Sequence, residues 1–200
     1  MVHLGVPCFT PGARIDTPSG PRPVENLLPG DRIVTRDSGT NIILWIGRKT
    51  LSWSDLRRNR HLAPVLLRAG SLGDDVPARD ILVSPNHRIL AETERSTLFH
   101  ADPEVLVPAK HLVDNRNILE VDALGVTYHH FLFDRHEVVH SDGVWSESFQ
   151  PADYTLSAVG NAQRAEILEL FPDLRAPEGM VRFEDARRTL RWPDMRRWRD

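Results

Sequence analysis

The sequence of 200 residues has very little cysteine, because Cys8 is the only one. A single thiol cannot form a disulfide within the chain, and it cannot supply a zinc site built from paired CxxC motifs. A strong excess of one charge is also missing, since the formal net charge is −3. Nucleic-acid-binding domains usually carry a clear positive excess, so the composition gives no support to a nucleic-acid partner.

Long hydrophobic runs are absent as well. The longest, Ile42–Ile46, has five residues, whereas a membrane-spanning helix needs about 18. Met1–Pro7 is too short to be a signal peptide and carries no lysine or arginine. We therefore predict no membrane partner and take the cytoplasm as the default location. The sequence gives no indication of the oligomeric state.

What the sequence does contain is typical of many short strands. Hydrophobic residues make up 40% and charged residues 26% of the chain, as in a globular protein with one buried core. Fifteen prolines and twelve glycines separate short runs that are rich in β-branched residues, and such runs favour strands. The expected strands are Ala13–Thr17, Arg32–Thr35, Asn41–Ile46, Val65–Ala69, Asp80–Val83, Arg88–Ala91, Glu104–Val107, Asn117–Val121, Val126–Phe133 and Glu137–His140.

After Pro151 the hydrophobic spacing becomes that of a helix. Ala165, Leu168 and Phe171 recur every three residues, and Asn161 is a suitable N-cap. We predict a helix over 161–171 whose hydrophobic face packs on the β body. The expected organisation is a leader (1–7), a β domain (8–151) and a small helical C-terminal extension (152–200).

The β region also contains a weak internal repeat. Thr10–Ile15 matches Ser84–Ile89, and Pro23–Ile33 matches Pro108–Ile118, in the same order. Where a turn of the first copy has glycine, the second has asparagine, and these two residue types best tolerate a left-handed backbone. We therefore predict an all-β fold of two halves related by a pseudo-two-fold axis.

Cys8 and His87 are the residues most suited to chemistry in this arrangement. They enter the two halves from corresponding ends, so the pseudo-symmetry brings both toward the axis. A thiolate is the strongest nucleophile among side chains, and a nearby histidine activates it. Ser84 adds a hydroxyl three residues before His87, across a rigid proline. The structural alternative is a small buried Cys8 and a His87 that only forms hydrogen bonds.

A second group of candidates is the histidine-rich segment around residue 130. His129 and His130 alternate on an expected strand, so they point to opposite faces, and one is expected to be buried. Together with His136 and His140 they offer an alternative zinc site, since imidazole is a common zinc ligand. Their spacing matches no standard zinc motif, so we expect no metal and no other cofactor.

Several short motifs together resemble the bacterial Hint (hedgehog/intein) domain family. They are Cys8-Phe9-Thr10-Pro11-Gly12, Val24-Glu25-Asn26-Leu27 with Pro29-Gly30-Asp31, Ser84-Pro85-Asn86-His87, and His130 followed by Asp134-Arg135-His136, Gly143 and Glu147-Ser148. They occur in the expected order between Cys8 and Pro151. The resemblance implies a pseudo-two-fold, all-β horseshoe of short strands, in agreement with the repeat.

The resemblance also implies a self-processing activity. In the family, the first cysteine attacks the carbonyl before it and converts a peptide bond into a thioester, which is an N–S acyl shift. This role maps onto Cys8, with the carbonyl of Pro7 as the target. The family's Thr-x-x-His motif maps onto Ser84 and His87. It implies that His87 contacts the scissile amide nitrogen as a general acid and that Ser84 stabilises charge on the carbonyl oxygen.

Departures from the family pattern restrict this activity. The family's acidic residue on the preceding strand is missing, with His129 or His130 near its place, and His136 is a further candidate acid or base. Inteins end in His-Asn, whose asparagine cyclises to release the chain. The corresponding positions here hold Glu147-Ser148, which lack the amide. The resemblance thus implies thioester formation and N-terminal cleavage of the upstream polypeptide in cis, without splicing.

Two alternative functions fit the same residues. The ring of Pro7 restricts the donor carbonyl, and a seven-residue leader is a small donor, which favours a Hint-fold interaction module that no longer cleaves. The histidine group favours a metal-binding β protein. The leading hypothesis is a single-turnover, cysteine autoprotease-like domain. Its expected site residues are Cys8, Ser84, His87, His130 and His136.

Overall fold

The computed structural model describes residues 6–92, 104–151, 156, 159–176, 179 and 181–190. In these ranges the strands are β1 (Arg14–Thr17), β2 (Gly20–Pro23), β3 (Arg32–Thr35), β4 (Gly39–Ile42), β5 (Trp45–Ser52), β6 (Val65–Leu67), β7 (Ile81–Val83), β8 (Arg88–Glu92), β9 (Glu104–Pro108), β10 (Ile118–Glu120), β11 (Gly125–Leu132), β12 (Val138–Ser141) and β13 (Val144–Glu147). The helices in the same ranges are α1 (Trp53–Arg58), α3 (Ala109–Leu112) and α5 (Asn161–Leu170), with the 3-10 turns η1 (Val24–Asn26), η2 (Arg60–Leu62), η3 (Pro172–Arg175) and η4 (Val181–Phe183). Strands dominate, as predicted.

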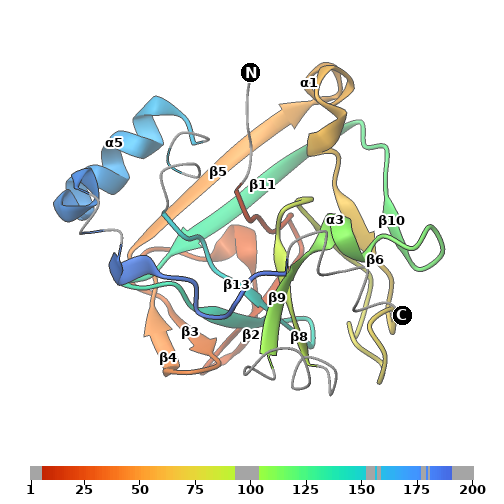
Figure 1. Ribbon diagram of the computed structural model, residues 1–200, viewed down its shortest axis with the longest axis horizontal. Coiled ribbons are helices and arrows are strands. Elements are labelled where there is room, and N and C mark those ends of the chain that lie inside the picture. Colours follow the sequence, from red (N-terminus) through yellow and green to blue (C-terminus); the bar gives the residue numbers. More distant parts are fainter. Residues whose placement is uncertain are drawn as a thin grey trace.

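The described strands pair into antiparallel sheets that share one body. The largest has eight strands, with β2-β1-β12-β13-β8-β9 in order and β3 pairing with β12 and β4. A second sheet has the order β10-β6-β7. In the third, β5 and β11, of eight residues each, run side by side diagonally up to α1 (Figure 1). This long ribbon carries His129 and His130 of the histidine-rich segment, whereas His136 and His140 follow it in the chain.

The internal repeat predicted from the sequence is present in the fold. β1 and β2 form an antiparallel pair that is followed by η1 and β3. In the second half, β8 and β9 pair in the same way and are followed by α3 and β10. Gly30 (φ +97°) and Asn115 (φ +59°) both have left-handed backbone at equivalent turns. The other expected pair differs, because Gly12 has φ +88° whereas Asn86 is not left-handed. The all-β, pseudo-two-fold horseshoe is confirmed.

Helix starts follow local capping rules. At α1, the Ser52 side chain accepts a hydrogen bond from the Asp55 backbone, and the Asp55 carboxylate accepts one from Ser52 in return. At α5, Gly160 occupies the N-cap position and Asn161 is the first helical residue. The asparagine expected as the cap therefore lies one position inside the helix.

The predicted C-terminal helix is present, with a correction to its buried face. Ile167 is fully buried, Leu168 and Phe171 pack partly against the core, and Ala165 is exposed. The expectation that Ala165 docks the helix is therefore wrong, because the contact is centred on the bulkier Ile167. Ile167 packs in the same hydrophobic cluster as Cys8.

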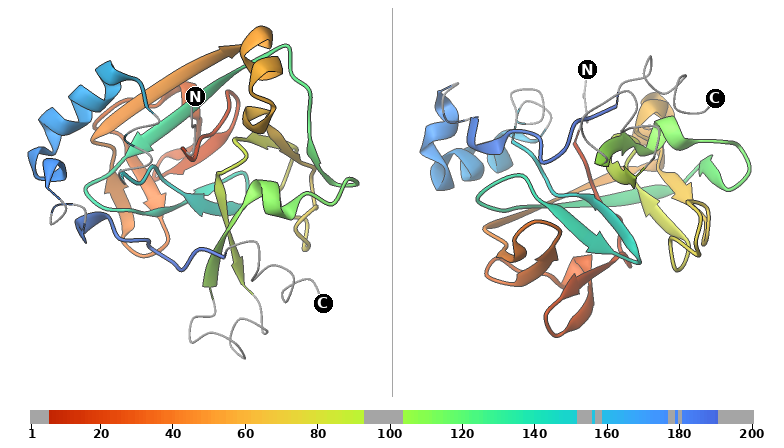
Figure 2. Two further views of the ribbon diagram at one scale, coloured as in Figure 1. Left: turned by 45° about the horizontal axis from the view of Figure 1, so that its top comes forward. Right: turned by 60° about the horizontal axis from the view of Figure 1, so that its bottom comes forward.

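The segment after α5 returns to the β body. Leu106 of β9 donates its N–H to the carbonyl of Arg188 at 2.9 Å, and Leu190 donates to the carbonyl of Leu106 at 2.9 Å. These bonds lay the segment alongside β9 (Figure 2). Phe183 and Leu190 are buried in two different hydrophobic clusters. Residues beyond α5 are thus tied to the core at several points.

The expected leader is only partly visible, since residues 1–5 lie outside the described ranges. Val6 and Pro7 are described, and both are buried. Within the ranges that the structure describes, no helix combines the length and the hydrophobicity that crossing a lipid bilayer requires.

Candidate active site around Cys8

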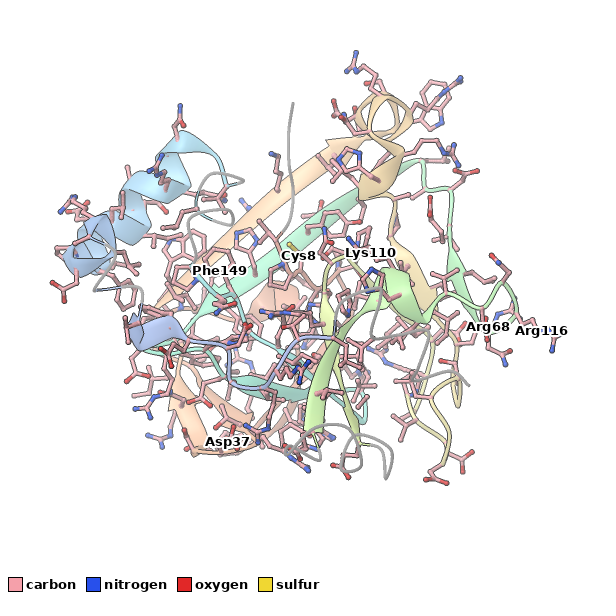
Figure 3. All side chains as sticks on the ribbon, viewed as in Figure 1. Cys8, Asp37, Arg68, Lys110, Arg116 and Phe149 are labelled. Carbon is pink, nitrogen blue, oxygen red and sulfur yellow. The ribbon has the colours of Figure 1, made fainter. Side chains whose placement is uncertain are left out.

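Cys8 lies between β11 and the end of β7, where the two halves of the repeat meet. The next residue, Phe9, exchanges two backbone hydrogen bonds of 2.8 Å with His129 of β11, and Ser84 donates its N–H to the carbonyl of Cys8 at 3.0 Å. The Cys8 side chain is 1% exposed. Figure 3 shows Cys8 in the middle of the molecule, between the labelled Phe149 and Lys110. Cys8 of the first half therefore lies beside the Ser84–His87 turn of the second half, as predicted.

Ser84 holds the chain on both sides of Pro7. Its Oγ accepts the backbone N–H of Cys8 at 2.9 Å and donates to the carbonyl of Val6 at 3.0 Å. The family resemblance implies His87 at the amide nitrogen and Ser84 at the Pro7 carbonyl. In the structure, Ser84 itself contacts the amide nitrogen, and the carbonyl that it contacts is one residue further upstream. The hydroxyl reaches both atoms because it sits directly beside the Cys8 backbone.

His87 is fully buried, and neither of its ring nitrogens has a hydrogen-bond partner in the described part of the chain. Its ring packs edge-on against Phe9, with the centroids 4.5 Å apart. Burial lowers the pKa of His87 to about 4, and the charge of Arg88 acts in the same direction while that of Glu147 opposes it. His87 is therefore neutral at pH 7, and it keeps an unused N–H.

His130 is the histidine that faces the thiol. Its Nδ1 lies 3.6 Å from Cys8 Sγ, and its ring packs near Trp45 and Phe149 with centroid distances of 5.3 and 5.4 Å. Its Nε2 has no hydrogen-bond partner among the described residues. Burial lowers the pKa of His130 to about 3, helped by the neighbouring charges of His129 and Lys49. The sequence left His129 and His130 as alternatives, and the structure places His130 beside the thiol.

The thiol of Cys8 is uncharged in this environment. Burial raises its pKa well above the ordinary range, and Glu147 adds to this, while the hydrogen bond from Ser84 and the charge of Lys49 act in the opposite direction. The thiol also donates a hydrogen bond to the carbonyl oxygen of Val6, 3.5 Å from Sγ. The site thus combines a neutral thiol with a neutral imidazole.

His136 occupies a different place from the one that a role at Cys8 requires. Its Nδ1 accepts the backbone N–H of Ala186 at 3.0 Å, which puts the ring proton on Nε2, 3.3 Å from Glu147 Oε2. Its side chain is completely buried. The structure therefore places His136 in a polar network around Glu147, and we find no contact of His136 with Cys8 among the described interactions.

Arg88 is the centre of that network, and sequence reasoning missed it. Its backbone N–H and its Nε donate to the two carboxylate oxygens of Glu147 at 2.8 and 2.6 Å. Its guanidinium also donates to Asp185 at 2.7 Å and to Gln150 at 2.9 Å. Burial raises the pKa of Glu147, but Arg88 and His136 outweigh this, and the pKa is lowered overall. The available signal was a charged residue that opens the apolar strand β8, directly after His87.

The four histidines of the alternative zinc site are dispersed. His130 faces Cys8, His136 faces Glu147, and His140 places Nδ1 2.7 Å from Asp16. His129 lies on the opposite face of β11 from His130. In the ranges that the structure describes, no group of three or more His, Cys, Asp or Glu side chains is placed to hold a metal ion.

The fold and the site together define a class of protein: a duplicated β domain with a cysteine–histidine site where its halves meet. A model of the family described as Hint domain matches residues 7–153. The chain therefore belongs to the Hint domain family, as its motifs predicted.

Three solved structures are similar to this chain at low sequence identity. A bacterial intein-like domain from Clostridium thermocellum is 15% identical, with a TM-score of 0.45, and covers 70% of this chain and 97% of its own. The gp41-1 intein is 12% identical, with a TM-score of 0.40 and the same two coverages. The M86 variant of the Ssp DnaB mini-intein is 12% identical, with a TM-score of 0.41, and covers 73% of this chain and 97% of its own. No curated protein sequence matches the chain.

Proposed function

We propose that this Hint domain converts the Pro7–Cys8 peptide bond into a thioester by an N–S acyl shift, with the polypeptide upstream of Cys8 as its substrate in cis. The proposal is carried by the positions of two side chains around Cys8. Its amide nitrogen is held by Ser84 at 2.9 Å while its thiol lies 3.6 Å from His130 Nδ1. Ser84 thus holds the nitrogen of the bond that breaks, and His130 faces the thiol that attacks.

The first step is attack of the thiol on the carbonyl carbon of Pro7. His130 is neutral at pH 7, so its Nδ1 accepts the thiol proton in the tautomer that carries hydrogen on Nε2. Because burial raises the pKa of Cys8 and lowers that of His130, a proton transfer that precedes attack is strongly unfavourable. The proton therefore moves as the C–S bond forms.

The second step breaks the C–N bond and requires a proton on the amide nitrogen of Cys8. Ser84 Oγ already accepts the N–H of this nitrogen, and the hydroxyl proton, which it otherwise directs at Val6, turns to the lone pair that the nitrogen gains in the tetrahedral intermediate. His87 lies on the same turn, with its backbone N–H on the Ser84 carbonyl at 3.0 Å. Its unpartnered imidazole returns a proton to Ser84 as general acid and recovers one from His130, which took it from the thiol in the first step, so the acyl shift ends with both histidines neutral and no net proton change. The nitrogen that leaves becomes a free α-amino group on Cys8.

The reaction ends without splicing, because the C-terminal end of the domain offers no amide for cyclisation. The carboxylate of Glu147 is bound to Arg88 at 2.6 Å, and Ser148 Oγ accepts the N–H of Glu137 at 3.0 Å. Both side chains are thus engaged in structural bonds. A protein fused after Asp200 is expected to stay attached under every condition that releases an N-terminal partner.

A second candidate is a Hint-fold interaction module that does not cleave. The observation in its favour is the uncharged site, since burial raises the pKa of the Cys8 thiol and lowers that of His130 to about 3. The Pro7 ring adds a restriction on the carbonyl that must rotate toward the thiol. The two candidates differ in one measurable product, a thioester at Cys8.

The experiment is a fusion with a folded partner ahead of Met1, treated with hydroxylamine, which cleaves thioesters and spares peptide bonds. We expect release of the partner with a break at Pro7–Cys8 and no release from Cys8→Ala. His87→Ala and His130→Ala should each be slower by at least ~10²-fold, the usual effect of losing an acid–base group. His129→Ala is the matched control and should retain release, because its side chain lies on the other face of β11.

Pro7→Gly provides the decisive variant. Glycine frees the donor carbonyl to rotate toward the thiol, so this variant should release its partner faster than the native sequence. A Pro7→Gly fusion that remains both intact and unbranched after prolonged hydroxylamine treatment would overturn the proposal and leave the interaction module.

A further inference from the structure

One face of the β5–β11 ribbon carries the site, and a lysine lies on that face. Strand pairing places Gly47 opposite His130 and Lys49 opposite Tyr128. Paired residues of antiparallel strands point to the same side, so Lys49 and His130 are diagonal neighbours. The separation of such neighbours is about 7–8 Å between backbones, within reach of a long side chain. Gly47, directly opposite His130 and two residues before Lys49 on β5, contributes no side chain of its own.

The electrostatics of the site agree with this placement. The charge of Lys49 lowers the pKa of the Cys8 thiol and also that of His130. Tyr128, directly across from Lys49, is buried in the same hydrophobic cluster as Cys8. Lys49 is half-buried, and it makes no hydrogen bond or ion pair with any other residue that the structure describes.

The second lysine of the chain differs in this respect. Lys110 donates from Nζ to Asn86 Oδ1 at 2.7 Å and is therefore engaged in the turn that carries Ser84 and His87. The remaining 23 of the 25 basic residues are arginines, which are protonated at any relevant pH and are not nucleophiles. Of the two lysine amines, only that of Lys49 is without a described partner, and it is the one on the Cys8 face.

The other groups around Cys8 are poorly suited to take over an acyl group. The thiol is 1% exposed, which restricts water. The carboxylate of Glu147 is bound to Arg88, and the Ser148 hydroxyl accepts a backbone hydrogen bond. A thioester formed here needs an acceptor that is already within the site.

We propose that Lys49 is the acceptor of the acyl group, so that the domain joins its upstream polypeptide to its own β5 through an isopeptide bond. This inference rests on the proposed thioester at Cys8. The Lys49 amine, after its charged form has released one proton to solvent, adds to the thioester carbonyl of Pro7, the C–S bond breaks, and a C–N bond to Nζ forms. The proton that Nζ loses goes to the Cys8 sulfur, which leaves as a thiol. No water and no co-reactant enters, and one amide replaces another.

The product is recognised by its peptides after digestion. The mass of the whole chain is unchanged, but the chain becomes branched and gains a second α-amino group, on Cys8. Trypsin cuts after Arg48 and not after an acylated Lys49. It should therefore release residues 49–57 carrying a branch that ends in Pro7, together with a separate peptide that begins at Cys8.

The experiment uses the full chain of 200 residues, with and without a folded partner ahead of Met1, followed by tryptic digestion and mass spectrometry. Lys49→Arg keeps the positive charge and removes the nucleophilic amine. Lys110→Arg is the matched control, since it alters the other lysine and keeps a donor for Asn86. Each variant is also treated with hydroxylamine, so that the branched product is expressed as a ratio to the thioester trapped in the same sample.

We expect the branched peptide in the native chain and in Lys110→Arg, and none in Cys8→Ala. Its ratio to trapped thioester should fall at least tenfold in Lys49→Arg. Trapping of the thioester without any branched peptide in the native chain would overturn Lys49 as acceptor and leave the proposed function intact. Absence of both products would overturn the two proposals together, and a branch located on Lys110 would overturn this one alone.

Discussion

Gly47 lies directly opposite His130 in the β5–β11 pair, and the place where a Cβ would stand is 2.5 Å from His130 Nε2. The same place also conflicts with the ring of Trp45. The histidine that faces Cys8 therefore has its position because its cross-strand partner has no side chain.

Gly47→Ala should displace the His130 ring and lower both stability and activity. Overpacking of this kind typically costs about 1–3 kcal/mol, which denaturant unfolding would measure, and thioester formation should slow because Nδ1 moves away from Sγ. Gly160→Ala is a suitable control, since a Cβ there meets nothing within 4 Å. Equal unfolding free energies and release rates for the native chain and Gly47→Ala would show that the ring has room that the structure does not indicate.

The buried ion pair of Arg88 and Glu147 should be far more sensitive to substitution than an exposed one. Their side chains are 8% and 1% exposed, and removal of one partner from such a pair costs roughly 3–5 kcal/mol because the other charge stays buried and uncompensated. We expect a loss of that size in Glu147→Gln, measured by urea unfolding. Asp122→Asn, which breaks the exposed pair with Arg60, should change stability by at most about 1 kcal/mol. Similar losses in the two variants would contradict this ranking.

The two buried histidines of the site should make the fold sensitive to acid. The folded pKa values of His87 and His130 are about 4 and about 3, below their unfolded value. Between the folded and the unfolded pKa of each histidine, the unfolded chain binds more protons than the folded one. The contribution of each neutral histidine to the free energy of unfolding is therefore fully present above roughly pH 6.5 and is lost as the pH decreases. Each histidine should remove roughly 3 kcal/mol by pH 4.

The measurement for this prediction is the free energy of unfolding as a function of pH in the native chain and in His130→Gln. The variant should show a shallower slope between pH 4 and 6.5, because one group that protonates on unfolding is gone. His61→Gln, at an exposed position, serves as the control and should retain the native slope. Parallel curves for the native chain and His130→Gln would refute the assignment.

The docking of α5 should depend on one residue more than on the rest of its face. Ile167 is fully buried, so Ile167→Ala is expected to cost about 2–5 kcal/mol, the usual range for truncating such a side chain in a core. Leu170, 53% exposed on the same helix, is the matched control, and Leu170→Ala should have little effect on the melting temperature. If Leu170→Ala destabilises as much as Ile167→Ala, the helix packs in another orientation.

Features with a local signature could be predicted from the sequence. The Gly30 and Asn115 turns, the repeated strand pairs and the helix after Pro151 all follow from turn chemistry and from hydrophobic spacing over short windows. The nearness of Cys8 to the Ser84–His87 turn also followed, because the repeat relates the two segments by symmetry.

Features that depend on contacts between residues far apart in the sequence could not be predicted. Strand alternation showed that His129 and His130 face opposite ways, but both are buried, and only the tertiary fold shows that His130 is the one beside Cys8. The bond from Ser84 to the amide nitrogen of Cys8 depends on backbone position to within an ångström, and no sequence pattern encodes that. The network of Arg88 with Asp185 joins residues 97 positions apart without any shared motif.

The return of residues 183–190 to the β body has a consequence for the order in which the site is completed. Asp185 and Thr189 are partners of Arg88, and Ala186 is the partner of His136, yet all three lie beyond the residues that match the Hint family. On a ribosome, Cys8 and His87 emerge long before these partners do. The charge of Arg88, which borders His87, therefore gains its last partners only once residues 185–189 have been synthesised, which makes the completion of the site a later step than the synthesis of the part that matches the family.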